Sequence, residues 1–67
     1  MTNDIAKLKT PGEILEAALV KEKAAFDFYS DLLNHTRIGM VRELVAQLKD
    51  EEQKHVRLIE QKLAELN

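Results

Sequence analysis

The chain has one place where a helix would have to stop, at residues 34–39 (Asn-His-Thr-Arg-Ile-Gly). Long runs rich in Ala, Leu, Glu and Lys lie on either side of this break, and the 67 residues include only one proline and two glycines. Such a composition leaves little for strands or further turns. Asn34 can end a first helix and Thr36 can cap a second. We therefore expect an all-α protein with helices at about 11–34 and 37–66, and so short a connection makes them antiparallel neighbours.

The start of the first helix is marked by Thr10-Pro11-Gly12-Glu13. Threonine at the N-cap and glutamate three residues later form a capping box, and proline at the first helical position loses no hydrogen bond. We interpret residues 10–67 as one helical hairpin. Residues 1–9 are mostly polar and form either a frayed tail or a short packed arm; the sequence does not choose between the two.

The second helix carries an apolar stripe that ionisable residues interrupt. The stripe consists of residues spaced three and four apart, which share one helical face: Val41, Leu44, Val45, Leu48, Ile59, Leu63 and Leu66. At about 100° per residue, the centre of this face passes between Glu52 and His55. Glu52 falls about 20° from the centre and Glu51 roughly 80° from it. We expect Glu52 to point at the core and Glu51 to lie at its rim.

The first helix has a matching stripe with one acidic residue at its centre. Its apolar members are Leu15, Ala18, Leu19, Ala25, Phe26, Tyr29 and Leu33. Glu22 lies in the middle of this face. In an antiparallel hairpin, Glu22 and Glu52 would each lie about fifteen residues, or roughly 22 Å, from the turn, with His55 one helical turn further on. The three residues are therefore expected to converge.

The composition excludes several classes of site and partner. The chain has no cysteine, so disulfides, thiolate metal sites and thiol catalysis are excluded, and any metal ligands must be oxygen or nitrogen. The formal net charge is −2 with both signs interspersed, which favours neither nucleic acid nor an anionic membrane as a partner. No apolar run approaches a membrane span, and the amino end lacks the pattern of a signal peptide, so we expect a cytoplasmic protein.

Taken singly, each of the three interrupting residues has an ordinary explanation. Glu-x-x-His arises often by chance in a chain this rich in glutamate, and most glutamates are solvated. It is much less common by chance for three such residues to lie on the core-facing sides of both helices and at the same height along the hairpin. The combination of Glu22, Glu52 and His55 therefore favours a metal site.

One hairpin supplies half of a known ligand set. Two hairpins packed face to face form a four-helix bundle in which two helices each give a Glu and the other two each give a Glu-x-x-His, as in di-iron carboxylate bundles. Two divalent ions would balance four carboxylates that are costly to bury alone. In this homodimer, or a higher oligomer, we assign Glu22 as a terminal ligand, Glu52 as the bridging carboxylate and His55 as the nitrogen ligand. All three are candidate metal-binding and catalytic residues.

The ligand types indicate the chemistry. Carboxylate and imidazole suit Fe, Mn or Zn, and two iron ions with open positions suit reactions with O2 or peroxide. We expect two iron ions per dimer and oxidation of Fe(II) as the activity. Tyr29 lies two turns from Glu22 on the same stripe, and its hydroxyl either bonds to one of the carboxylates or its ring simply packs in the core.

These residues also resemble a known group of proteins. The segments 22–30 and 48–55, with the pattern Glu-x6-Tyr and Glu-Glu-x-x-His, are similar to the ferritin-like superfamily, in particular rubrerythrins and encapsulated ferritins, over about residues 12–66. The resemblance implies that Glu22, Glu52 and His55 are ligands and that Tyr29 is the neighbouring tyrosine. It also implies a ferritin-like four-helix bundle whose di-iron ferroxidase centre forms between two single-hairpin subunits, often within larger rings, and which delivers oxidised iron to a surrounding protein shell.

Other functions fit parts of the pattern. Rubrerythrin-like peroxide scavenging is one alternative, although this chain has a single hairpin, no cysteine, and Leu19 where rubrerythrins carry a further glutamate. A dimeric hairpin that binds metal only to assemble is another, and a metal-free interaction hairpin is a third. His35 has no carboxylate three residues before it, and we assign it no function.

Overall fold

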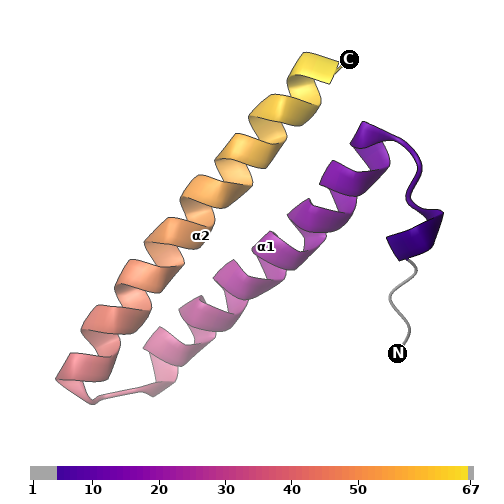
Figure 1. Ribbon diagram of the computed structural model, residues 1–67. Coiled ribbons are helices and arrows are strands. Elements are labelled where there is room, and N and C mark those ends of the chain that lie inside the picture. Colours follow the sequence, from indigo (N-terminus) through magenta and orange to yellow (C-terminus); the bar gives the residue numbers. More distant parts are fainter. Residues whose placement is uncertain (1–4, 67) are drawn as a thin grey trace.

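The computed structural model describes residues 5–66, which are helical throughout apart from short connections (Figure 1). A single turn of 3-10 helix, Ile5–Lys7, precedes two α-helices, α1 (Pro11–His35) and α2 (Gly39–Leu66). The two long helices run side by side in opposite directions. The predicted all-α hairpin is therefore confirmed.

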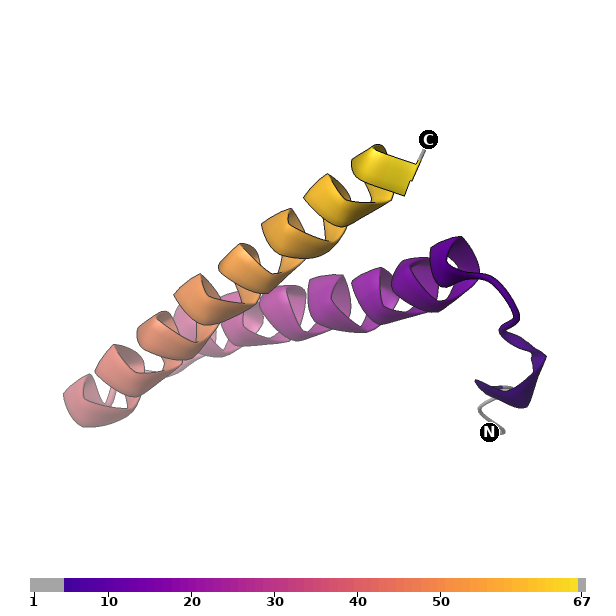
Figure 2. The ribbon, with the colours of Figure 1, turned by 45° about the horizontal axis from the view of Figure 1, so that its top comes forward.

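The segment before α1 stands apart from the hairpin. Ile5–Lys7 contain no buried residue, and the turn lies beyond α1 on the side away from α2 (Figure 2). Leu8, the next residue, is half-buried, and the prediction of a tail or an arm for residues 1–9 stays open. The prediction for residues 1–4 falls outside the described residues.

The predicted capping box starts α1. The Thr10 hydroxyl accepts a hydrogen bond from the Glu13 amide at 3.1 Å, and a Glu13 carboxylate oxygen accepts from the Thr10 amide at 3.0 Å. The same oxygen accepts from the Lys9 amide at 2.9 Å. These bonds satisfy amides that a helix start leaves unpaired, and such a cap stabilises a helix by about 1 kcal/mol.

The connection differs in detail from the expected one. Residues 36–38 join the helices, so α2 begins at Gly39, two residues later than expected. Thr36 does not cap α2: its backbone is extended and its amide donates to the Leu32 carbonyl at 2.8 Å, which closes the end of α1. The first helical hydrogen bond of α2 runs from the Arg42 amide to the Ile38 carbonyl, at 2.9 Å.

A side chain from α2 completes the end of α1. The Arg42 guanidinium donates to the Leu33 carbonyl and, at 2.9 Å, to the Thr36 carbonyl. A cation at this point satisfies carbonyls that the helix leaves without partners and complements the negative end of the helix dipole. Arg42 therefore ties the first turn of α2 to the last turn of α1.

The core of a single hairpin is thin. Only two of the described side chains are buried, Leu19 at 8 % exposed and Val45 at 6 %. The other apolar residues between the helices, among them Leu15, Phe26 and Val56, are half-buried. A chain of this size rarely gains enough apolar burial to be stable alone.

One side of the hairpin has apolar residues without a partner. The exposed members are Ile14 and Leu32 in α1 and Val41, Leu44 and Leu66 in α2. Around each helix axis, these residues are rotated in the same direction from the buried residue of that helix, Leu19 in α1 and Val45 in α2. Because the two helices run in opposite directions, the two sets of exposed residues face the same side of the hairpin. We call this side the open flank. His55 of α2 lies on it as well.

Candidate metal centre

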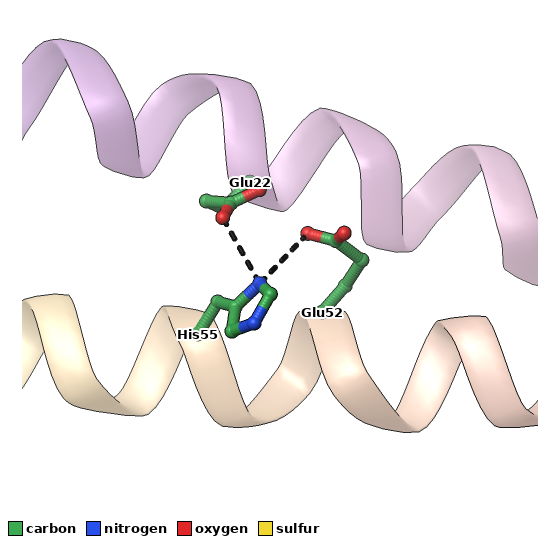
Figure 3. A group of neighbouring side chains, drawn as sticks. All are labelled: Glu22, Glu52 and His55. Atoms are coloured by element: carbon green, nitrogen blue, oxygen red, sulfur yellow. Dashed lines mark ion pairs between the residues drawn. The ribbon is translucent and has the colours of Figure 1, made fainter.

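Three side chains meet between the helices at mid-height of the hairpin. Glu22 comes from α1, and Glu52 and His55 come from α2 (Figure 3). His55 Nδ1 lies 3.1 Å from Glu22 Oε1 and 3.7 Å from Glu52 Oε2. One potential ligand atom from each residue lies within 4.8 Å of the other two. The structure thus brings together the three residues whose convergence the sequence predicts.

The hairpin register explains the meeting. Glu22 lies thirteen residues before the last residue of α1, and Glu52 lies thirteen residues after the first residue of α2. Because both helices rise by the same amount per residue from a short connection, these two positions are level. His55 follows Glu52 by three residues, which keeps both side chains on one face.

The three side chains differ in exposure. The Glu52 side chain is 17 % exposed, that of Glu22 29 % and that of His55 48 %. Exposure therefore increases from Glu52, between the helices, to His55, on the open flank. Within residues 5–66, the Glu52 Oε2 atom is shielded from solvent and has no hydrogen-bond partner. A carboxylate oxygen in that position is costly unless a cation or a donor reaches it.

The carboxylates also affect each other. The nearby Glu22 carboxyl is the main cause of a raised pKa of Glu52, and burial and charge repulsion from Glu22 add to it. His55 opposes this effect and lowers the pKa of Glu52. The Glu52 carboxyl therefore holds its proton more strongly than a free glutamate, because a second carboxyl lies beside it and burial disfavours its charge.

The donor set fits a first-row metal ion. Two carboxylates and one imidazole offer hard oxygen and borderline nitrogen ligands, which suit Fe, Mn or Zn. The unpartnered Glu52 oxygen supports this fit, because an ion between Glu22, Glu52 and His55 would contact it. Three protein ligands would leave coordination positions for further ligands.

Two other residues from the sequence analysis lie outside this group. Tyr29 is half-buried with its ring 5.6 Å from the Phe28 ring, and its hydroxyl makes no hydrogen bond within the described chain. A bond from Tyr29 to a carboxylate remains a prediction. His35 is exposed at the end of α1, where its Nδ1 lies 2.8 Å from the Asp31 carbonyl oxygen.

Sequence reasoning missed the contacts on the side opposite the open flank. Lys23 and Glu60 form an ion pair across the helices at 3.7 Å, and the Lys49 ammonium lies 5.3 Å from the centre of the Phe26 ring. Phe26 and Lys49 are almost level, nine and ten residues from the connected ends of their helices, so the register could have indicated their contact. Lys23 and Glu60 are twelve and twenty-one residues from those ends, so the register does not indicate theirs. These contacts help to hold the register that aligns Glu22 with Glu52.

Comparisons of the chain with protein-family models, with curated proteins and with solved structures found no match. Among the described residues, no helix combines the length and the apolar character needed to cross a membrane.

Proposed function

We propose that this chain is a homo-oligomeric ferritin-like protein that binds two iron ions between two hairpins and oxidises Fe(II) with O2 or peroxide. The observation that supports it most strongly is the group formed by Glu22, Glu52 and His55, with ligand atoms within 4.8 Å and a shielded Glu52 oxygen that has no hydrogen-bond partner among the described residues. These are the residues that a helical hairpin would contribute to one half of a di-iron carboxylate bundle.

The open flank supports the second copy in this proposal. Its exposed Ile14, Leu32 and Leu44 surround the side on which His55 is half-exposed. A second hairpin packed there by a two-fold axis would bury these residues and bring a second Glu22, Glu52 and His55 beside the first. Four carboxylates and two divalent ions would then balance in charge.

In the proposed centre each residue has one role. Glu22 would be a terminal ligand, Glu52 would be the carboxylate ligand shared by the two ions, and His55 would supply the nitrogen ligand. Iron would supply the redox chemistry: two Fe(II) ions would give one electron each and, with two protons from water, reduce O2 to hydrogen peroxide or hydrogen peroxide to two water molecules. The chain contributes by holding the ions close together and by leaving positions where an oxidant can bind.

The direct test is the rate of Fe(II) oxidation. Protein loaded with Fe(II) without oxygen is mixed with O2 or peroxide, and Fe(III) formation is followed by absorbance for wild type, Glu52→Ala and Glu43→Ala. Glu43 is an exposed glutamate of α2, so its variant has the same charge change away from the site. We expect fast oxidation by wild type and Glu43→Ala, and the slow rate of free iron for Glu52→Ala. Equal rates for all three proteins would refute the proposal.

The thin core favours a second candidate, in which metal serves only to assemble the hairpins. Because only two side chains among residues 5–66 are buried, an ion that links two copies could supply the missing stability. Metal-dependent dimerisation without oxygen separates the two ideas. If Fe(II) and Zn(II) drive dimerisation equally and iron is not oxidised faster than in buffer, the site is structural.

A further inference from the structure

The imidazole of His55 has a second nitrogen that the metal centre does not use. Its Nδ1 faces the two carboxylates, at 3.1 Å from Glu22 and 3.7 Å from Glu52. The other ring nitrogen, Nε2, lies on the side of the ring away from the Glu22 carboxylate (Figure 3). A neutral imidazole carries one proton, so a ring that offers its Nδ1 lone pair to a metal has its proton on Nε2.

The outer side of His55 borders a hollow on α2 that contains a free acceptor. The hollow is lined by Gln47, Asp50, Glu51, Lys54, His55 and Leu58. Within residues 5–66, the Glu51 carboxylate takes part in no hydrogen bond or ion pair. It is exposed, so a hydrogen bond to His55 would not have to compensate for burial.

Helix geometry selects Glu51 among these residues. It precedes His55 by four positions, which places it about 40° around the helix from His55 and one turn toward the N-terminus. Side chains on a helix lean toward its N-terminus, so the His55 ring lies over the turn that carries Glu51. Asp50 precedes His55 by five positions and lies about 140° away around the helix, and Gln47 is two turns distant.

We propose that Glu51 is a positioning residue that accepts a hydrogen bond from the Nε2–H of His55. This inference rests on the proposed function, because it concerns a ligand of the proposed centre. The bond fixes the tautomer in which Nδ1 presents its lone pair to the metal, and a carboxylate partner makes that nitrogen more basic. Loss of such a partner typically weakens metal binding by about 10–100-fold.

The test measures zinc binding and the state of the ring, without any redox activity. Zn(II) affinity is determined by competition with a chromophoric chelator for wild type, Glu51→Ala, Glu51→Gln and Asp50→Ala. The Asp50 variant removes a charge from the same hollow without touching the ring. The His55 tautomer is read from the ring 15N shifts of the zinc-bound protein in a His35→Gln background, which leaves one imidazole.

The expected results are graded. Glu51→Ala binds Zn(II) about 10–100-fold more weakly, and the His55 Nε2–H signal is lost to solvent exchange. Glu51→Gln retains an acceptor oxygen and loses less affinity, and Asp50→Ala stays within a few-fold of wild type. Far-ultraviolet circular dichroism checks that each variant keeps its helices.

Failure of the inference and failure of the proposed function give different results. Wild type that binds Zn(II) no better than His55→Ala would refute the metal centre itself. Wild type that binds well, together with Glu51→Ala that binds equally well with unchanged His55 shifts, would overturn the role of Glu51 alone. Equal weakening in Asp50→Ala and Glu51→Ala would also overturn it, because the effect would then be one of general charge.

Discussion

Replacing Glu52 by leucine should stabilise the metal-free protein. Glu52 is only 17 % exposed, its shielded Oε2 has no hydrogen-bond partner in the described chain and lies 3.7 Å from His55 Nδ1, and the Glu22 carboxyl raises its pKa. A buried polar atom without a partner costs about 1–3 kcal/mol. Leucine has no such atom and adds apolar contact between the helices.

The expected gain is toward the lower end of that range, because Glu52 keeps some contact with water. A gain of about 1–2 kcal/mol corresponds to a rise in the melting temperature of roughly 5–15 °C for a chain of this size. The same substitution removes a proposed metal ligand. Added metal should therefore raise the melting temperature of wild type and leave that of Glu52→Leu unchanged.

The assay is thermal unfolding followed by circular dichroism, in a chelator and then with Zn(II), at one fixed protein concentration. Glu43→Leu is the matched control, since Glu43 is an exposed glutamate on the same helix and its replacement should change stability by less than about 0.5 kcal/mol. A Glu52→Leu protein that melts at or below the wild-type temperature in chelator, with the control unchanged, would refute the claim that this carboxylate is destabilising without metal.

Two further predictions concern the hairpin itself. Leu19→Ala should lower stability by about 2–4 kcal/mol, because Leu19 is one of two buried side chains, whereas Val20→Ala on the exposed side should have little effect in the same melting assay. Glu13→Gln should remove a stabilisation that depends on pH. The backbone amides of Lys9 and Thr10 lower the pKa of Glu13, so the wild-type advantage is present above the pKa of an unfolded glutamate and disappears as pH falls through the folded pKa. A difference in melting temperature that stays constant from neutral to acidic pH would contradict this.

Much of the hairpin could be predicted because its determinants are local. The capping box at Thr10 and Glu13 uses residues four positions or fewer apart, and the apolar stripes follow the period of a single helix. The meeting of Glu22 and Glu52 also follows from short-range information, since a short connection sets both helices level. The helical periodicity and the position of the single connection therefore determine which residues of α1 and α2 lie level with each other.

The start of α2 could not be predicted, because it depends on contacts between the two helices and not on local sequence. Thr36 has the chemistry of an N-cap, but it closes α1, and the Arg42 side chain then bonds to carbonyls on the other helix. That choice depends on how α2 packs against α1 and not on residues 34–39 alone. The cross-helix contacts of Lys23 and Lys49 escaped prediction in the same way.

Under the proposed function, metal binding and assembly are linked. A single hairpin leaves the open flank uncovered, and its three candidate ligands would hold an ion on one side only. A metal-free dimer would bring four carboxylates together, two of them Glu52 side chains that already resist ionising beside Glu22. Each process therefore lacks what the other supplies: the ions relieve the repulsion between the acids, and the second copy completes the ligands. By linkage, the factor by which metal strengthens the dimer equals the factor by which the dimer strengthens metal binding. The acidic residues that interrupt the apolar stripes would then make the assembled bundle depend on its metal.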